Sequence, residues 1–251
     1  LAVITAHQAE ALQALLGDAV PVRWAMRYGN PAIAGELAAL MDSGCDRVLI
    51  APLYPQYSAA TNATVADKVG EALQAMRRQP ALRTLPPYYS DPAYIGALAK
   101  DLGGQIDALP FTPEALLLSF HGLPERAVRL GDPYHAHCLE TARLLESELA
   151  RPSLRVVTTF QSRFGRAKWL EPATDAVLEK EAAAGTRRLA VAAPGFSADC
   201  LETLEELAIR GRETFEGAGG QDFAVLSCLN ASRAGMEMLE TLVRRELAGW
   251  I

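Results

Sequence analysis

Short apolar runs alternate along the chain with longer segments in which apolar residues recur every three to four positions. The short runs are continuous, which is typical of strands covered on both faces of a sheet. The longer segments have the period of amphipathic helices, and alternation of the two predicts parallel βαβ units. The predicted strands cover residues 20–26, 47–52, 115–120, 154–160, 188–193 and 223–228.

The predicted helices begin and end at residues with capping roles. Asn30 and Pro31 suit the N-cap and first position of one helix, and Asp132 and Pro133 suit those of another. Gly185 stands where a helix C-terminus favours glycine. The predicted helices cover residues 7–16, 31–41, 61–78, 91–102, 134–150, 172–184, 199–215 and 232–249.

Turn-forming residues in the middle of the chain suggest a domain junction near residues 109–113. We expect two α/β lobes, residues 1–108 and 109–228, and a C-terminal helix within residues 229–251. The pattern leaves open on which lobe that helix packs.

Composition narrows the class of protein. Half of the 251 residues are apolar and 22% are charged, which excludes disorder, and the net charge of −6 argues against a nucleic-acid partner. The four cysteines form no CxxC pair, so a zinc ribbon or disulfide framework is not expected and a reducing, cytoplasmic compartment fits. The first residues lack signal-peptide features, and the longest uncharged run, residues 48–66, contains two prolines and is no membrane span. A peripheral membrane contact stays open.

Functional side chains in open parallel sheets follow the carboxyl ends of strands. His121 follows the third predicted strand and precedes Gly122, so its imidazole could accept a proton or bind a metal. A purely structural histidine is the alternative. His135 and His137 are two positions apart on a helix, and we expect them at the surface rather than as ligands.

A basic aromatic loop follows the fourth predicted strand. Its residues Arg163, Arg166 and Lys168 lie beside Phe164 and Trp169. This composition suits a flat aromatic or carboxylate-bearing ligand, and a solvated basic loop is the alternative.

Two glutamates follow the fifth predicted strand. Glu202 and Glu206 are four residues apart, so they share one helical face and could accept a proton or bind a cation. The alternative is a capping box in which Asp199 is the N-cap and Glu202 the third helical residue.

Taken together, these loops resemble the ferrochelatase family, whose members insert Fe²⁺ into a porphyrin. A short chain with few cysteines resembles a Gram-negative bacterial member of this family. The resemblance implies two Rossmann-like, chelatase-like lobes with parallel sheets and an active-site cleft between them. The matching strings are Arg27-Tyr28, YPQYS at 54–58, SFHGLP at 119–124, GDPY at 131–134, FQSRFG at 160–165, Trp169-Leu170 and PGFSADCLETLEE at 194–206.

The resemblance also implies roles for individual residues. It places His121 and Glu202 at the catalytic and metal positions. Cys200 stands where some members have a second histidine, so that residue's role does not transfer. The residues expected to bind the porphyrin are Arg27, Tyr28, Trp169, Asp199 and Glu206.

The implied activity is insertion of Fe²⁺ into protoporphyrin IX to form protohaem in haem biosynthesis. The alternatives are a coproporphyrin ferrochelatase, another tetrapyrrole metal chelatase, or an inactive porphyrin-binding fragment. Iron is then a substrate, no cofactor is permanently bound, and no 2Fe–2S cluster is expected because only Cys228 lies near the C-terminus. The partners are porphyrin and ferrous iron, and a location peripheral to the inner membrane is compatible.

The chain begins at Leu1, and its first residues resemble a family segment inside the first lobe. We therefore expect an N-terminally truncated chain that lacks the first strand and one pocket wall. Such a chain would be a poor catalyst.

Overall fold

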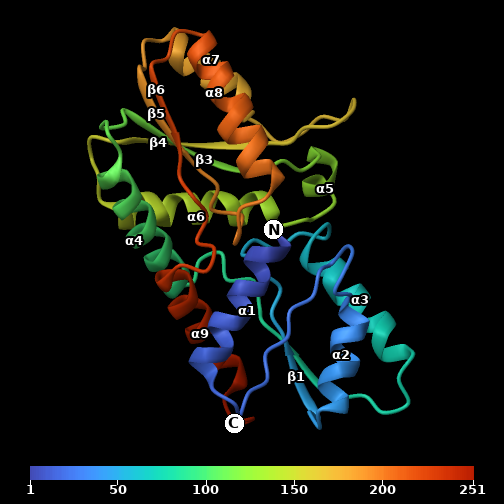
Figure 1. The fold of residues 1–251 in the computed structure, drawn as a ribbon. Coiled ribbons are helices and arrows are strands. Elements are labelled where there is room, and N and C mark those ends of the chain that lie inside the picture. The colour runs from blue at the N-terminus through green and yellow to red at the C-terminus, as the bar shows by residue number, and fades with distance from the viewer.

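The computed structural model describes residues 1–251 as an α/β molecule with two parallel sheets (Figure 1). The smaller sheet pairs β1 (Arg47–Ile50) with β2 (Ala81–Thr84). The larger sheet has the strand order β4-β3-β5-β6. Its strands are β3 (Ala115–His121), β4 (Arg155–Gln161), β5 (Arg188–Ala192) and β6 (Asp222–Val225). The fold is therefore the predicted parallel α/β architecture.

Helices cover both sheets (Figure 1). Before β3 lie α1 (Ala2–Leu16), α2 (Ile33–Asp42), α3 (Asn62–Gln74) and α4 (Pro92–Ala108). After β3 lie α5 (Glu125–Arg129), α6 (Tyr134–Leu149), α7 (Thr174–Ala183), the π-helix η1 (Glu202–Gly211), α8 (Arg212–Gly217) and α9 (Arg233–Leu247).

The larger sheet is buried on both faces, as its continuous apolar strands predict. On β3, Leu116 and Leu118 join a core that includes residues of α4, α6 and α9. Ala115 and Leu117 face the opposite way, into a second core with residues of α7 and η1. None of these four side chains is exposed to solvent.

The predicted strand at residues 20–26 is wrong, because this segment runs as a loop that pairs only at Met26 with Ala32. The side chain of Gln13 on α1 replaces a strand partner. Its Oε1 accepts the Val22 N–H (2.8 Å) and its Nε2 donates to the Val20 carbonyl (3.2 Å). Backbone N–H and carbonyl groups that form hydrogen bonds to a side chain in this way do not need a neighbouring strand.

Several helix starts also differ from the prediction. The second helix begins at Ile33 after an Ala32 cap, so Asn30 and Pro31 are not its cap and first residue. Asp132 does accept the Tyr134 N–H (3.0 Å) at the start of α6. The expected helix at residues 199–215 is a π-helix followed by α8, and both β2 and α5 were missed.

The C-terminal helix α9 packs against α1 and α4, beside the smaller sheet (Figure 1). The structure thus decides a question that the sequence left open. The division into residues 1–108, 109–228 and 229–251 remains a prediction. No helix is long and apolar enough to cross a membrane.

A run of hydrogen-bond donors joins the loop after β1 to α6 and the turn before it. The bonds run from Gln56 Nε2 to Thr141 Oγ1 (3.0 Å), from the Tyr57 N–H to His137 Nδ1 (3.2 Å), and from the Ser58 hydroxyl (2.9 Å) and the Ala59 N–H (2.8 Å) to Asp132 Oδ2. His137, expected as a free surface residue, is half-buried and stacks on Tyr89 with ring centroids 3.7 Å apart.

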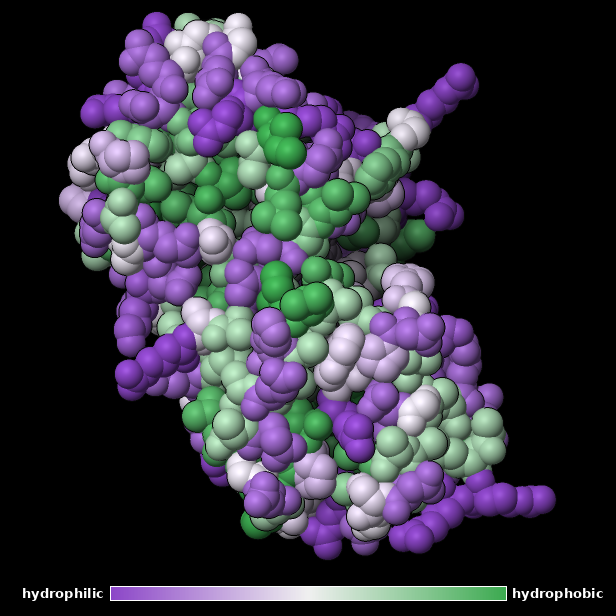
Figure 2. All heavy atoms as spheres, in the orientation of Figure 1, coloured by the Kyte–Doolittle hydropathy of each residue, from purple (hydrophilic) through white to green (hydrophobic).

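Apolar side chains also reach the surface. Figure 2 shows them among polar residues across the middle of one face, between the two parts of the molecule. Near the N-terminus, Leu1 and Val3 are 56% and 68% exposed.

Candidate active site

The loops that follow β3, β4 and β5 meet at the carboxyl end of the larger sheet. His121 is the last residue of β3 and lies opposite Gln161 on β4. Gln161 Nε2 donates to the Glu202 carbonyl (3.4 Å), and the His121 ring lies 6.4 Å from the ring of Phe196. The fold thus brings the histidine and the glutamate, 81 positions apart in sequence, to the same buried glutamine.

The imidazole of His121 is oriented by its own backbone neighbour. Its Nδ1 lies 2.7 Å from the Gly122 carbonyl oxygen. Because a carbonyl only accepts, Nδ1 carries the proton in this contact and Nε2 is left as the acceptor. The Tyr134 hydroxyl also donates to the His121 carbonyl (2.9 Å), which fixes the strand end.

Gly122 has a steric reason to be glycine. A Cβ at this position would lie 2.6 Å from the Gln161 carbonyl oxygen and 3.1 Å from the Trp169 ring. The Gly122 N–H donates to that same carbonyl (2.7 Å). The close approach of backbones keeps β3 and β4 paired up to the histidine.

Glu202 is the first residue of the π-helix η1 and is half-buried. Turns of π-helix are rare and occur often at functional sites. The neighbouring Cys200 thiol has its pKa raised to about 11, by burial first and then by a hydrogen bond to Glu202. Without a bound metal it is therefore a neutral thiol near pH 7.

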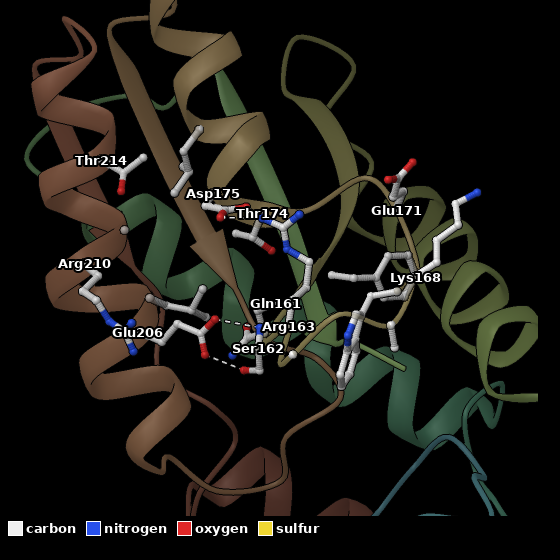
Figure 3. Close-up of a pocket in the computed structure, with 17 residues that line it drawn as sticks. Gln161, Ser162, Arg163, Lys168, Glu171, Thr174, Asp175, Glu206, Arg210 and Thr214 are labelled. Atoms are coloured by element: carbon white, nitrogen blue, oxygen red, sulfur yellow. Dashed lines mark hydrogen bonds and ion pairs between the residues drawn. The ribbon is translucent and has the colours of Figure 1, made fainter. Parts of the chain in front are cut away.

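Glu206 is one turn further along η1, and its carboxylate is already bound. Its Oε1 accepts the Ser162 N–H (2.7 Å) and its Oε2 accepts the Ser162 hydroxyl (Figure 3). Ser162 is buried and has a φ of 61°, a conformation that favours glycine. This contact ties the loop after β4 to η1.

Asp199 precedes η1, and its carboxylate accepts three hydrogen bonds. The donors are the Asn230 side-chain amide (2.6 Å), the Thr203 hydroxyl (3.0 Å) and the Cys228 N–H (3.3 Å). The capping box considered as the alternative role of Asp199 and Glu202 does not form, because Leu201 is the N-cap of η1 and has no side-chain cap.

The basic loop after β4 borders a pocket of about 670 Å³ on the side of η1 (Figure 3). Trp169 lines it, and its indole N–H donates to the Phe164 carbonyl (2.9 Å). Two of its cations are paired, Arg163 with Asp175 (2.7 Å) and Lys168 with Glu125 (3.0 Å). Neither His121 nor Glu202 lines this pocket, whereas Glu206 does.

Arg27 and Tyr28 lie in the other part of the molecule, after the loop at residues 20–26. The Arg27 guanidinium sits 4.4 Å from the centre of the Tyr28 ring, and its Nε has no hydrogen-bond partner. Tyr28 is 72% exposed. Burial raises the pKa of the nearby Tyr54, and the charge of Arg27 opposes that rise.

Three further residues hold the site, and no motif in the sequence marks them: Gln161, Asn230 and Gln8. Gln161 lies in the FQSRFG string at 160–165, but nothing in its spacing shows that it lies opposite His121 and donates to the Glu202 carbonyl. Gln8 Nε2 donates to the carbonyls of Ser197 (2.9 Å) and Asn230 (3.0 Å), contacts that span up to 222 positions. No local pattern could have revealed them.

Comparison with known proteins adds the family. The ferrochelatase family model matches residues 1–247. The chain is 51% identical over 253 residues to the ferrochelatase of Bradyrhizobium diazoefficiens, covering 100% of this chain and 73% of that protein. It is 54% identical over 232 residues to the ferrochelatase of Rhizobium meliloti, covering 92% and 68% of the two chains.

Solved structures show the same fold at low identity. SirB from Bacillus subtilis with Fe³⁺ superposes with a TM-score of 0.71 at 14% identity, covering 98% of this chain and 89% of that one. A multi-domain protein from Deinococcus radiodurans with structural similarity to chelatases gives 0.61 at 16%, covering 96% and 50%. The two-lobed parallel architecture is thus chelatase-like, and on the sequence match the chain belongs to the ferrochelatase family.

Proposed function

We propose that the chain inserts Fe²⁺ into protoporphyrin IX to form protohaem, with His121 and Glu202 as the reacting side chains. The observation that carries the proposal is the placement of His121. Its Nδ1 faces the Gly122 carbonyl, so Nε2 is free to accept a proton, and Gln161, which lies opposite His121 on β4, donates to the Glu202 carbonyl. Family membership supports the reaction class.

Metal insertion requires a base and weak metal ligands. Two pyrrole protons must leave the porphyrin as the metal binds, and a neutral imidazole accepts protons near pH 7. Imidazole and carboxylate groups also bind divalent iron. No group of three or more His, Cys, Asp or Glu side chains is arranged to hold a metal ion. In this proposal the iron ion is a substrate that is passed on to the porphyrin.

The porphyrin-binding side chains are a separate part of the proposal. Trp169 and Glu206 line the pocket beside η1, whereas Arg27 and Tyr28 lie on the other lobe. A flat macrocycle bound between lobes could contact both sets. Asp199 and Glu206 would contribute less directly, because their carboxylates accept hydrogen bonds from protein groups.

The test of the reaction is anaerobic haem formation from Fe²⁺ and protoporphyrin IX. The His121→Ala variant is expected to lose metallation while porphyrin fluorescence quenching still reports binding. His7→Ala is the matched control, because His7 is exposed on α1. Near-normal turnover by His121→Ala would contradict the role of His121.

The same assay separates the other candidates. Coproporphyrin and an isobacteriochlorin, each offered with Fe²⁺ and Co²⁺, test the related chelatases. Activity only with Co²⁺ and the isobacteriochlorin would overturn the proposal, and porphyrin binding without any metallation would favour an inactive binding protein.

We also infer a cytoplasmic location, with peripheral contact to the inner membrane as a further part of the proposal. All four cysteines are free thiols, and three of them are buried, as suits a reducing compartment. Cell fractionation tests this: recovery in an oxidising compartment would contradict it.

A further inference from the structure

Asn230 lies between β6 and α9 and binds Asp199 at two points. Its Oδ1 accepts the Asp199 N–H (2.8 Å), and its Nδ2 donates to Asp199 Oδ2 (2.6 Å). Its φ of 48° is a left-handed conformation, which asparagine adopts more readily than most residues. In this backbone conformation the Asn230 side chain contacts Asp199.

The other oxygen of Asp199 closes the turn that carries Glu202. Asp199 Oδ1 accepts the Thr203 hydroxyl (3.0 Å), and the Thr203 oxygen accepts the Cys200 N–H (3.0 Å). Thr203 is 1% exposed. These hydrogen bonds close residues 199–203 into a short turn that contains Glu202, and Asn230 binds its first residue, Asp199.

Asn230 is itself bound to a wider frame. Its N–H donates to the Ser197 carbonyl (3.1 Å), and Gln8 donates to the carbonyls of both residues. The Ser197 hydroxyl donates to the Leu53 carbonyl (2.8 Å), in the loop after β1. The frame thus joins α1, the loops after β5 and β6, and the smaller sheet.

We propose that Asn230 is a positioning residue that fixes Asp199, and through Asp199 the start of η1, so that Glu202 is presented beside His121. Asp199 is then an anchor rather than a reacting carboxylate. The inference rests on the proposed function, because it assigns Glu202 a place in that reaction.

The variants follow from the donors and acceptors. Asn230→Gly keeps the left-handed backbone and removes the side chain. Asn230→Asp replaces the donating amide with a carboxylate facing Asp199. The exchange Asp199→Asn with Asn230→Asp restores every bond, because Asn at 199 can donate to Asp at 230 and still accept from Thr203 and Cys228. Ser227→Gly is the control, since Ser227 is exposed in the same segment.

Misplacement of a reacting group by about 1 Å can cost on the order of 100-fold in rate. We therefore expect kcat for haem formation to fall about 10- to 100-fold in Asn230→Gly, and further in Asn230→Asp, with KM for porphyrin changed less than about threefold. The exchanged pair should recover to within about threefold of the parent, and Ser227→Gly should match it. Unchanged kcat in Asn230→Gly overturns the proposal. An exchanged pair that is no more active than Asn230→Asp also overturns it, and that result would assign the charge of Asp199 a direct role.

A second measurement does not depend on activity. Hydrogen exchange should speed up at the amides of residues 200–206 in Asn230→Gly, stay slow in β5, and return to the parent rate in the exchanged pair. If the parent chain forms no haem, the proposed function fails, and the exchange pattern still decides the anchor. Unaltered exchange at residues 200–206 would contradict it.

Discussion

Gly195 lies where the loop after β5 meets side chains from both lobes. A Cβ there would be 3.2 Å from Phe120 Cδ1 and 3.3 Å from Gln56 Oε1, closer than most such contacts. Gly122 is restricted in the same way by the Gln161 carbonyl. At the residue scale, the site therefore depends on glycines whose missing Cβ would meet close neighbours at the strand ends.

The first residue-scale prediction is that Gly195→Ala lowers the free energy of unfolding by about 1–3 kcal/mol, because overpacking forces neighbours to shift. Gly70→Ala is the control with the opposite sign. Gly70 lies inside α3 with no atom near its missing Cβ, so alanine should stabilise the protein by about 0.5–1 kcal/mol. Urea unfolding measures both, and equal midpoints for the two variants would contradict the steric argument.

At the element scale, the C-terminal end of α9 is capped by arginines from the smaller sheet. Arg83 on β2 donates to the Glu246 and Ala248 carbonyls, the latter at 2.9 Å, and its guanidinium lies 4.2 Å from the centre of the Trp250 ring. Arg47 donates to the Trp250 carbonyl (3.2 Å). Cations at a helix C-terminus satisfy its free carbonyls and interact well with its dipole.

We expect Arg83→Met to lower the free energy of unfolding by about 1–2 kcal/mol, because it keeps the apolar stem and removes the charged donors. Arg233→Met is the matched control on the same helix. Arg233 is exposed and pairs only with Glu237, so its loss should cost less than about 0.5 kcal/mol. Chemical unfolding compares them, and a loss no larger for Arg83→Met than for Arg233→Met would contradict the capping role.

The elements also show where sequence patterns were sufficient. Apolar runs located the five strands β1, β3, β4, β5 and β6. The signal is clearest in β3 and β5, where burial on both faces leaves a continuous apolar run. β2 was missed because its four residues include Arg83 and Thr84 and form a short strand at the edge of a two-stranded sheet. Residues 20–26 had the right composition for a strand and still form none, and Gln13 bonds the backbone of Val20 and Val22 in place of a neighbouring strand.

At the scale of the whole molecule, residues 56–59 donate hydrogen bonds to acceptors on or before α6, and one of these acceptors is the imidazole of His137. Burial lowers the pKa of His137, and the charge of Asp132 opposes this shift. Tyr57 donates to Nδ1, so this nitrogen must be unprotonated, and Tyr89 stacks on the ring. Protonation of Nδ1 would place an imidazole N–H against the Tyr57 N–H, and this hydrogen bond would be lost.

The sign of the pH dependence follows. Because the pKa of His137 is lower in the folded than in the unfolded state, His137 contributes stability that is present above about pH 6.5. This stability is lost as the pH falls from there through the lowered folded-state pKa. We expect the parent to lose more stability than His137→Gln between pH 7.5 and pH 5.5, because a glutamine oxygen accepts the Tyr57 N–H without titrating. Urea unfolding at both pH values measures the difference, and equal losses would contradict it.

The pattern of apolar and polar residues was sufficient to predict the parallel α/β class, the chain order of most elements and the loops in which the candidate side chains lie. The class and the order of elements follow from local periodicity. The candidate loops follow from the tendency of functional side chains to lie after the carboxyl ends of parallel strands. The family resemblance then singled out His121 and Glu202 within those loops, and their roles remain predictions.

Packing in three dimensions determines that α9 lies on α1 and α4, that residues 202–211 form a π-helix, and that Asn230 binds Asp199. Each of these depends on partners far apart in sequence, such as Ser162 with Glu206 or Gln8 with Asn230. A hydrogen bond between distant residues leaves no period in the sequence, because its geometry exists only once the sheets and helices have packed.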